Sequence, residues 1–427
     1  MLEIQKKLTN SFYAMLSLPS TAMGFALSIQ ISALSWILST KYHLNIEEVG
    51  IVWAAGPAAG IIGQVLIGLI SDKVWFWGGR RRPFILIGGV VASLMLIALP
   101  NIDKIAVFLG YKSLMGVAIA VALTLDLAIN ISFNPTRSII ADVTPEGTAR
   151  TKGYTWMQTI SGFFGVFAYV VGATLGNYNL IWVGVVIVLL FSVLPTFFIK
   201  ESKTLTVEST SDNSSVEEAV TKKTNIPELL KLFLAHGFSW IGIQTMFVFI
   251  FAYIQNILNI KDDKYIGQII AISFAILNTI GFILPALVLE PITEKIGRVK
   301  THMLCVATMA LGYLLIVLSG NGMFKVFGIE IYHIYIFMAI AGIGWAAVVS
   351  LPFAIMTDFV NKKQTGLYMG IFNLSVVIPQ LIVSLFIGKW ISGVVDKNLI
   401  FIISTVSLAI SAGLWLLVKD TKSKKLA

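Results

Sequence analysis

The chain has 427 residues, of which 57% are hydrophobic and only 12% are charged, and its mean hydropathy is +0.86. Because a soluble domain carries about 25% charged residues, this composition excludes an ordinary water-soluble protein and predicts a chain that folds in lipid. A single cysteine excludes an internal disulfide, and four histidines without a Cys/His cluster argue against a metal site.

The apolar residues fall into twelve runs of the length that a membrane-spanning helix needs, about 20 residues. A polar, Ser/Thr-rich stretch at about 201–226 separates six runs from the other six. We therefore predict an all-α integral membrane protein with an N-terminal six-helix half at 1–200, a cytoplasmic linker at 201–228 and a C-terminal six-helix half at 229–427. The predicted spans are 12–39, 47–70, 83–100, 113–140, 153–176, 180–199, 230–257, 265–289, 301–319, 330–356, 365–388 and 398–418.

The net charge of +9 is distributed very unevenly between the predicted loops. When the loops are assigned to alternating sides, the side that holds both termini carries 23 of the 31 lysines and arginines. Loops that carry such an excess face the cytoplasm, so we predict cytoplasmic termini in a multi-pass protein of the cell membrane. This topological explanation of the basic residues argues against nucleic acid as a partner and leaves membrane lipid as the surrounding medium.

The two halves resemble each other in their charged loops. Asp72 after the second run corresponds to Glu294 after the eighth, and Asp142 at the end of the fourth corresponds to Asp358 at the end of the tenth. Both offsets are close to half the chain length. Two six-helix repeats are a recurrent plan of transporters, in which substrate binds near the membrane midplane and the two halves rock to alternate access.

Apart from residues at the first two positions of a run, the only acids, lysines or arginines within the predicted spans are Asp126 and Arg137 of the fourth run. Asp126 and Arg137 are eleven residues apart, which is roughly 20° from three full helical turns and about 16 Å along the axis. They therefore share a face, with Asn130 on its flank, but are too far apart for a direct ion pair. Ionisable groups inside a span are costly and are functional candidates by default.

Two interpretations of this face remain open. In the functional one, Asp126 takes up and releases protons at its depth in the bilayer, and Arg137 binds substrate hydroxyl or carboxylate oxygens with its planar fork of donors. In the structural one, Asp126 bonds polar groups of a neighbouring helix and Arg137 belongs to a cytoplasmic charge network with Asp142.

Aromatic and amide side chains in the spans suit a polyol, because sugars stack on aromatic rings and hydrogen-bond to amides. The same residue types also anchor membrane interfaces and join helices, so each one separately favours a structural role. The candidates for substrate binding beside Arg137 and Asn130 are Gln30, Gln64, Phe133 and Trp240.

Charged residues at the cytoplasmic ends form a second candidate group. Acids at helix ends can pair with arginines of neighbouring loops in one conformer and release them in another, although a purely topological role of the arginines competes with this interpretation. The candidate gate residues are Asp72, Arg80, Arg81, Arg82 and Asp142 in the first half and Glu294, Arg298 and Asp358 in the second.

The stretch from Asp72-Lys73 to Arg82 resembles the signature loop of the major facilitator superfamily. The Gly79-Arg-Arg-Arg-Pro-Phe-Ile85 sequence and the spacing of Asp126, Asn130 and Arg137 resemble the sucrose transporter branch of the glycoside–pentoside–hexuronide:cation symporters, which includes bacterial disaccharide transporters. This resemblance implies proton coupling at Asp126 and sugar binding at Arg137. The chain departs from that branch at Ser28, where the family has glutamine.

Together these features predict a secondary active transporter that symports a sucrose- or maltose-like disaccharide with a proton by alternating access. The proton is the coupling ion, no other cofactor is expected, and the protein is expected to be a monomer. No phosphate-cradling loop and no catalytic constellation is evident in the sequence, which argues against an ATP-driven pump and an enzyme. The alternatives are transport or export of another small solute, and a sugar sensor of the same fold that does not transport.

Overall fold

The computed structural model describes residues 7–60, 70, 74–145, 148–201, 224–285, 289–361 and 365–420. The chain divides into two compact units. Unit 1 comprises Met1–Val207 together with Asp263–Ala271, and unit 2 comprises Glu208–Asp262 together with Ile272–Ala427.

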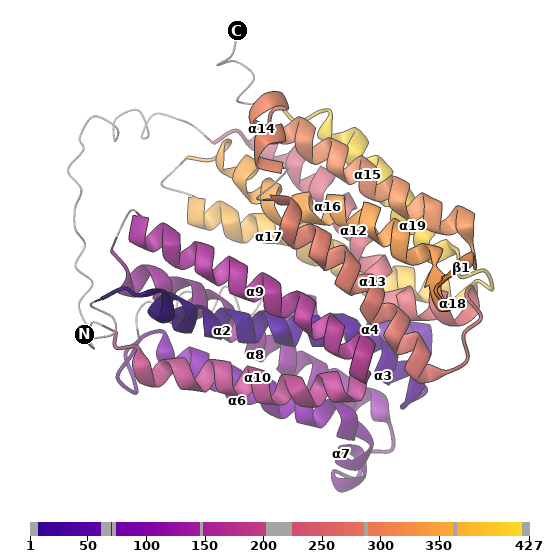
Figure 1. Ribbon diagram of the computed structural model, residues 1–427, viewed down its shortest axis with the longest axis horizontal. Coiled ribbons are helices and arrows are strands. Elements are labelled where there is room, and N and C mark those ends of the chain that lie inside the picture. Colours follow the sequence, from indigo (N-terminus) through magenta and orange to yellow (C-terminus); the bar gives the residue numbers. More distant parts are fainter. Residues whose placement is uncertain are drawn as a thin grey trace. The chain divides into compact units, whose positions relative to one another are not determined.

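Unit 1 is a bundle of long helices that lie alongside one another, coloured indigo to magenta in Figure 1. Its first span, Asn10–Thr40, begins at the N-cap Thr9 and contains a π-helical turn between two α-helical parts. The described elements are α2 (Asn10–Ile29), η1 (Gln30–Leu34), α3 (Ser35–Thr40), α4 (Ile46–Trp53), α6 (Arg82–Ala98), η2 (Leu99–Asn101), α7 (Ile102–Phe108), α8 (Leu114–Val143), α9 (Thr148–Leu175) and α10 (Asn177–Phe198).

Unit 2 is a second helical bundle, which also contains a two-stranded antiparallel hairpin. The first nine residues of α13 belong to unit 1 and the rest to unit 2. The described elements are α12 (Ile226–Asn256), α13 (Asp263–Leu284), α14 (Glu290–Ile296), α15 (Arg298–Ser319), β1 (Met323–Val326), β2 (Ile329–Tyr332), α16 (His333–Thr357), α17 (Thr365–Ile382), η5 (Val383–Ile387), α18 (Gly388–Gly393) and α19 (Leu399–Trp415).

Ten helices of the described residues are long and apolar enough to cross a membrane, and the apolar α19 adds a shorter one of 17 residues. Each of these eleven lies on one of the predicted spans. The twelfth prediction, 47–70, begins with α4 and is helical again up to residue 60, while residues 61–69 lie outside the described part of the chain. The chain is therefore a multi-pass membrane protein.

The same helix pairs pack in both units, which supports the predicted internal duplication. In unit 1 the first span (α2) packs on the fifth (α9) and sixth (α10), and the third (α6) packs on the fourth (α8) and sixth. In unit 2 the seventh span (α12) packs on α17 and α19, and the ninth (α15) packs on α16 and α19. Each helix pair of unit 2 corresponds to a pair of unit 1 when six is subtracted from the numbers of its two spans.

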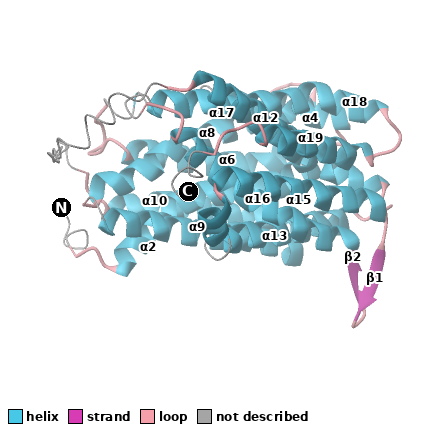
Figure 2. Cartoon of the chain, turned by 90° about the horizontal axis from the view of Figure 1, so that it is seen from above, coloured by secondary structure: helices cyan, strands magenta, loops and turns pink. Residues whose placement is uncertain are grey.

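The structure differs from the sequence prediction at several boundaries; the third span, for example, continues to Phe108 rather than ending at 100. Helix α12 begins at Ile226, with Asn225 accepting a hydrogen bond from the backbone of Glu228, so the last residues of the predicted linker are helical. The tenth span begins at His333 rather than 330, because Ile329–Tyr332 pair with Met323–Val326 in the hairpin that Figure 2 shows beyond the helices.

Candidate functional site

Asp126 lies in the interior of unit 1, where three spans meet. Its side chain, on α8, is only 5% exposed. The Nε2 group of Gln30, at the start of the π-turn η1, donates a hydrogen bond of 2.8 Å to Asp126 Oδ2. π-turns within α-helices occur frequently at functional sites because they redirect side chains, and here the turn carries the only amide bonded to this carboxyl in the described part of the chain.

Gly56 forms another wall of this site. A Cβ atom at residue 56 would lie 3.1 Å from Asp126 Oδ2 and 3.3 Å from Oδ1. The second span thus approaches the carboxyl through a residue without a side chain. In the sequence, nothing distinguishes Gly56 from a glycine that serves only helix packing.

The partner of Asp126 is neutral. Within the residues that the structure describes, no lysine or arginine forms an ion pair with this carboxyl. An amide such as that of Gln30 can donate to a carboxylate through its nitrogen, or accept from a protonated carboxyl through its oxygen. The site can therefore satisfy both protonation states of Asp126 without moving a charge.

The other predicted residues of α8 lie further along the same uninterrupted helix. The Nδ2 group of Asn130 donates to the backbone oxygen of Asp126 at 2.8 Å. The guanidinium of Arg137 lies over the ring of Phe133, 4.7 Å from its centroid, and the Arg137 side chain is exposed. The Tyr154 hydroxyl donates to the Arg137 carbonyl at 3.3 Å, so α9 holds the backbone beneath this guanidinium. Gln64 lies outside the described residues.

Unit 2 brings together aromatic and amide side chains from several helices. The Trp240 indole on α12 donates to Nε2 of His236 at 3.0 Å, and its ring meets Trp345 of α16 edge-on at 6.2 Å. The Trp345 indole in turn donates to Asn278 Oδ1 of α13 at 3.2 Å, and Phe247 packs against its ring at 5.3 Å. Of these residues, only Trp240 is predicted from the sequence to bind substrate.

A hydrogen-bonded amide pair joins the helix that carries Trp240 to α17. Gln380 Nε2 of α17 donates to Gln244 Oε1 of α12 at 3.2 Å. Trp240, Phe247, Asn278 and Trp345 are called the tryptophan cluster below. Three of these side chains are half-buried, so part of their polar and aromatic surface is accessible.

Charged side chains at the other end of α8 form a network in unit 1. Asp142 Oδ2 accepts from Arg80 Nη2 and from Arg81 Nε, both at 3.1 Å. The Glu201 carboxylate accepts the backbone N–H groups of Arg80, Arg81 and Arg82, each at 2.8 Å. Glu201 therefore caps the beginning of α6, where unpaired N–H groups and the helix dipole favour an anion.

Three of the predicted gate residues of unit 1 are thus joined in one network, and Glu201 is an addition that the sequence analysis did not make. Glu201 is the first acid after the sixth apolar run. Its partners are backbone N–H groups, which every residue but proline has, so the distribution of charged residues in the sequence does not predict this contact. The Arg82 guanidinium points elsewhere and contacts the Gly78 carbonyl at 3.5 Å. Asp72 lies outside the described residues.

Unit 2 repeats this arrangement at the corresponding positions. Arg298 Nη1 pairs with Asp358 Oδ2 at 3.2 Å. The Asp420 carboxylate lies against Gly297, just before α15, as the Glu201 carboxylate lies against Gly79, just before α6. Gly297 has a φ of +89°, which favours glycine there. Glu294 is exposed and forms no ion pair with any residue that the structure describes.

No group of three or more His, Cys, Asp or Glu side chains in the described residues is arranged to hold a metal ion. The polar features of the interior are instead an amide-bonded carboxyl, a cation on an aromatic ring and an indole–amide chain. Two repeated helical bundles with such groups among their spans define a membrane transporter.

Comparison with known proteins identifies the family. The family model described as Major Facilitator Superfamily matches residues 16–378 and 274–427, and the chain belongs to this family. Its known members are transporters, so the chain is a multi-pass membrane transporter and not an enzyme.

Curated relatives confirm the resemblance to sucrose transporters. Sucrose transport protein SUC4 of Arabidopsis thaliana is 24% identical over 88% of this chain and 84% of its own length. Sucrose transport protein SUT2 of Oryza sativa subsp. indica is 25% identical over 86% of both chains. The General alpha-glucoside permease of Schizosaccharomyces pombe is 26% identical over 36% of this chain and 31% of its own.

Solved structures confirm the predicted fold. The xylose transporter XylE from E. coli, in an inward open conformation, superposes with a TM-score of 0.71 at 14% identity, covering 97% of both chains. The nucleoside transporter NupG superposes with a TM-score of 0.69 at 12% identity, covering 96% of this chain and 99% of its own. The fold is therefore that of the major facilitator superfamily.

Proposed function

We propose that this protein is a sugar transporter that couples uptake of a disaccharide-like substrate to an inward flow of protons. The observation that carries the proposal is the buried Asp126 carboxyl, bonded to the amide of Gln30 rather than to a cation. The names of the relatives, which are sucrose and alpha-glucoside transporters, support a sugar as the substrate.

Asp126 carries the coupling proton in this proposal. A carboxyl that leaves water is penalised most when it is charged, so a proton neutralises it when water is excluded. The amide of Gln30 accommodates both states, and Gly56 lets the second span close on the carboxyl in either state. Alternating access then couples the protonation of Asp126 to the inward movement of sugar.

Substrate recognition uses two kinds of group. The exposed Arg137 guanidinium, held over Phe133, offers paired donors to vicinal hydroxyls. The tryptophan cluster offers ring faces for the apolar faces of a sugar, together with the Asn278 amide. Trp240, predicted from the sequence, belongs to this cluster, and Asn130, Gln30 and Gln64 remain the further proposed contacts.

The charged networks are proposed to latch the cytoplasmic ends of the helices. Support comes from their repetition, with Arg80 and Arg81 on Asp142 in unit 1 and Arg298 on Asp358 in unit 2. The excess of lysines and arginines on this side supports cytoplasmic termini and insertion in the cell membrane. We further propose that one chain transports as a monomer.

The proposal is tested with purified protein in proteoliposomes. Asp126→Asn keeps the size and polarity of the side chain but cannot titrate. We expect it to abolish uphill sugar accumulation driven by a pH gradient while sugar counterflow persists. Asp103→Asn is the matched control, because Asp103 is partly exposed and pairs with Lys41 at 3.2 Å. Unchanged accumulation by Asp126→Asn would exclude Asp126 as the proton carrier.

A panel of competing solutes tests the substrate. Mono- and disaccharides should inhibit uptake of a labelled α-glucoside, whereas nucleosides and amino acids should not. Failure of every saccharide to compete would refute the sugar assignment and favour another solute. Binding of a saccharide without counterflow would instead identify a sensor.

A further inference from the structure

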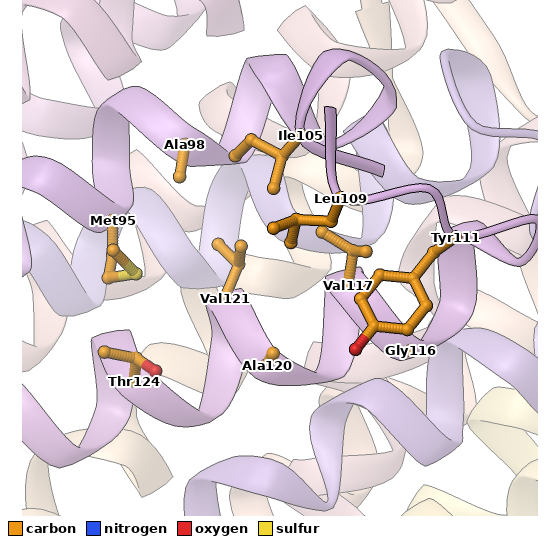
Figure 3. A pocket seen from close by; sticks show the side chains of 10 residues that line it. All are labelled: Met95, Ala98, Ile105, Leu109, Tyr111, Gly116, Val117, Ala120, Val121 and Thr124. Carbon is orange, nitrogen blue, oxygen red and sulfur yellow. The ribbon is translucent and has the colours of Figure 1, made fainter. Parts of the chain in front are cut away.

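A cavity of about 500 Å³ lies within unit 1, between α6, α7 and the first part of α8. Figure 3 shows residues of α6 and α7 along one wall and residues of α8 along the other, with Met95 and Thr124 at one end and Tyr111 at the other. None of its lining side chains is charged. The lining residues are Met95, Ala98, Ile105, Leu109, Tyr111, Gly116, Val117, Ala120, Val121 and Thr124.

The cavity extends deep into the region that hydrocarbon occupies. From Leu114, where α8 begins, to Thr124 is ten residues, or about 15 Å along the axis. This is roughly half of a hydrocarbon core of about 30 Å. Gly116 and Ala120 are exposed, so the cavity opens sideways between the spans. A space of this shape and polarity suits a single hydrocarbon chain.

The mouth of the cavity has the character of a membrane interface. Helix α7 ends in strongly exposed apolar side chains: Val107 is 81% exposed and Phe108 is 87% exposed. Water would penalise this surface, so it favours contact with lipid. This end of α8 is opposite to the end that carries Asp142 and its arginines.

Two exposed lysines adjoin lining residues of the cavity in the sequence. Lys104 precedes the lining residue Ile105, Lys112 follows the lining residue Tyr111, and both lysine side chains are exposed. The nearby acid Asp103 is paired with Lys41 at 3.2 Å, so its charge is already balanced. Two exposed lysines in the segments that line an apolar cavity would complement an anionic head group above an acyl chain.

We propose that this cavity binds one acyl chain of an anionic phospholipid, whose phosphate lies between Lys104 and Lys112. The site is separate from the proposed proton and sugar sites and does not depend on them. Its deep end is at Thr124, two residues before Asp126 on the same helix. A bound lipid would therefore brace the segment of α8 that holds the buried carboxyl.

The cavity can be filled by substitution without disturbing its walls. A Cβ atom at Gly116 meets no atom within 4 Å, and leucine favours a helix more than glycine does, so Gly116→Leu should fold and occupy the cavity. Gly413→Leu on α19 is the matched control, since Gly413 is also exposed and its Cβ also meets nothing within 4 Å.

Native mass spectrometry of the purified protein measures the binding. Phosphatidylglycerol and phosphatidylcholine with identical acyl chains are titrated onto delipidated protein. We expect one phosphatidylglycerol to bind roughly 10- to 30-fold more tightly than phosphatidylcholine. Gly116→Leu should lose this tight site, and Gly413→Leu should retain it. Equal retention by Gly116→Leu and the unchanged protein would overturn the proposal.

A second variant tests the head group independently of the cavity. Lys104→Gln combined with Lys112→Gln changes only exposed side chains, and should abolish the preference for phosphatidylglycerol while weak binding of either lipid persists. A preference that survives this change would overturn the assignment of the phosphate. A dimer that forms without lipid and that Gly116→Leu dissociates would also overturn the proposal. A second copy of the chain, and not a lipid, would then occupy the cavity.

Discussion

Gly56 lies against the carboxyl of Asp126 so closely that the smallest side chain would stand 3.1 Å from Oδ2. Gln30 reaches the same oxygen from the first span with a hydrogen bond of 2.8 Å. Three spans thus converge on one carboxyl through an amide and a glycine. Substitution of Gly56 and substitution of Gln30 should therefore affect the proposed proton site in different ways.

Gly56→Ala should slow transport. The added methyl group would crowd the carboxyl by a few tenths of an ångström, and overpacking of this kind costs about 1–3 kcal/mol. We expect initial rates of proton-driven uptake in proteoliposomes to fall at least about fivefold. Gly60→Ala, one helical turn away, is the control, because its Cβ meets no atom within 4 Å. Equal rates for the two variants would contradict the proposed close fit.

Gln30→Met should move the pH dependence of uptake. The substitution preserves length but removes the N–H group that stabilises the charged form of Asp126. A hydrogen bond to a charged group contributes about 1.5–3 kcal/mol and one to a neutral group about 0.5–1.5 kcal/mol, so the pH of half-maximal uptake should rise by about 1 unit. Uptake measured from pH 5 to pH 9 at constant gradient checks this. A profile that coincides with that of the unchanged protein would remove Gln30 from the proton site.

The sequence predicts candidate functional residues wherever a charged side chain interrupts an apolar or regular stretch. Asp126 stands out because an acid in an apolar run is costly, and the arginines of 80–82 stand out because they break the pattern between two spans. Contacts between helices cannot be recognised from the sequence in this way. Gly56 looked like an ordinary packing glycine, since only the fold places it beside Asp126.

Groups that depend on the backbone or on tertiary contacts were also not predictable. Glu201 binds three backbone N–H groups, and such partners are the same in every sequence. Trp240, Asn278 and Trp345 lie on three helices and meet only after folding. Residues 330–332 of the strand Ile329–Tyr332 are predicted as part of a span because they run directly into the apolar sequence of α16.

Substitutions of Glu201 should lower stability in a graded way. Glu201→Gln keeps one acceptor oxygen but loses the charge, whereas Glu201→Ala leaves three N–H groups at the start of α6 without this partner. Loss of a helix cap costs about 0.5–2 kcal/mol. We expect the melting temperature in detergent to decrease from the unchanged protein to Glu201→Gln and further to Glu201→Ala. Identical melting temperatures for all three would show that the cap does not stabilise the fold.

The two charged networks should differ in strength. Asp142 and its partners Arg80 and Arg81 have side chains that are 9–14% exposed, whereas Arg298 and Asp358 are 28% and 30% exposed. Solvent weakens the more exposed pair, and loss of Asp142 leaves two poorly hydrated arginines. We expect Asp142→Asn to cost about 2–3 kcal/mol and Asp358→Asn about 1 kcal/mol or less in denaturant unfolding. The reverse order would contradict this argument.

Trp345→Phe should weaken sugar binding with little effect on turnover. The substitution keeps an aromatic ring in the tryptophan cluster but removes the N–H group that holds Asn278 Oδ1 at 3.2 Å. Without this bond the Asn278 amide is held only by its donation to the Phe274 carbonyl at 2.9 Å, and the lost hydrogen bond contributes about 0.5–1.5 kcal/mol. The KM for sugar uptake should therefore rise roughly 3- to 10-fold, while kcat stays within about twofold. Trp390→Phe is the control, because Trp390 on α18 is 57% exposed and remote in sequence from the cluster. A larger fall in kcat than rise in KM would indicate that Trp345 acts in the conformational cycle rather than in sugar binding.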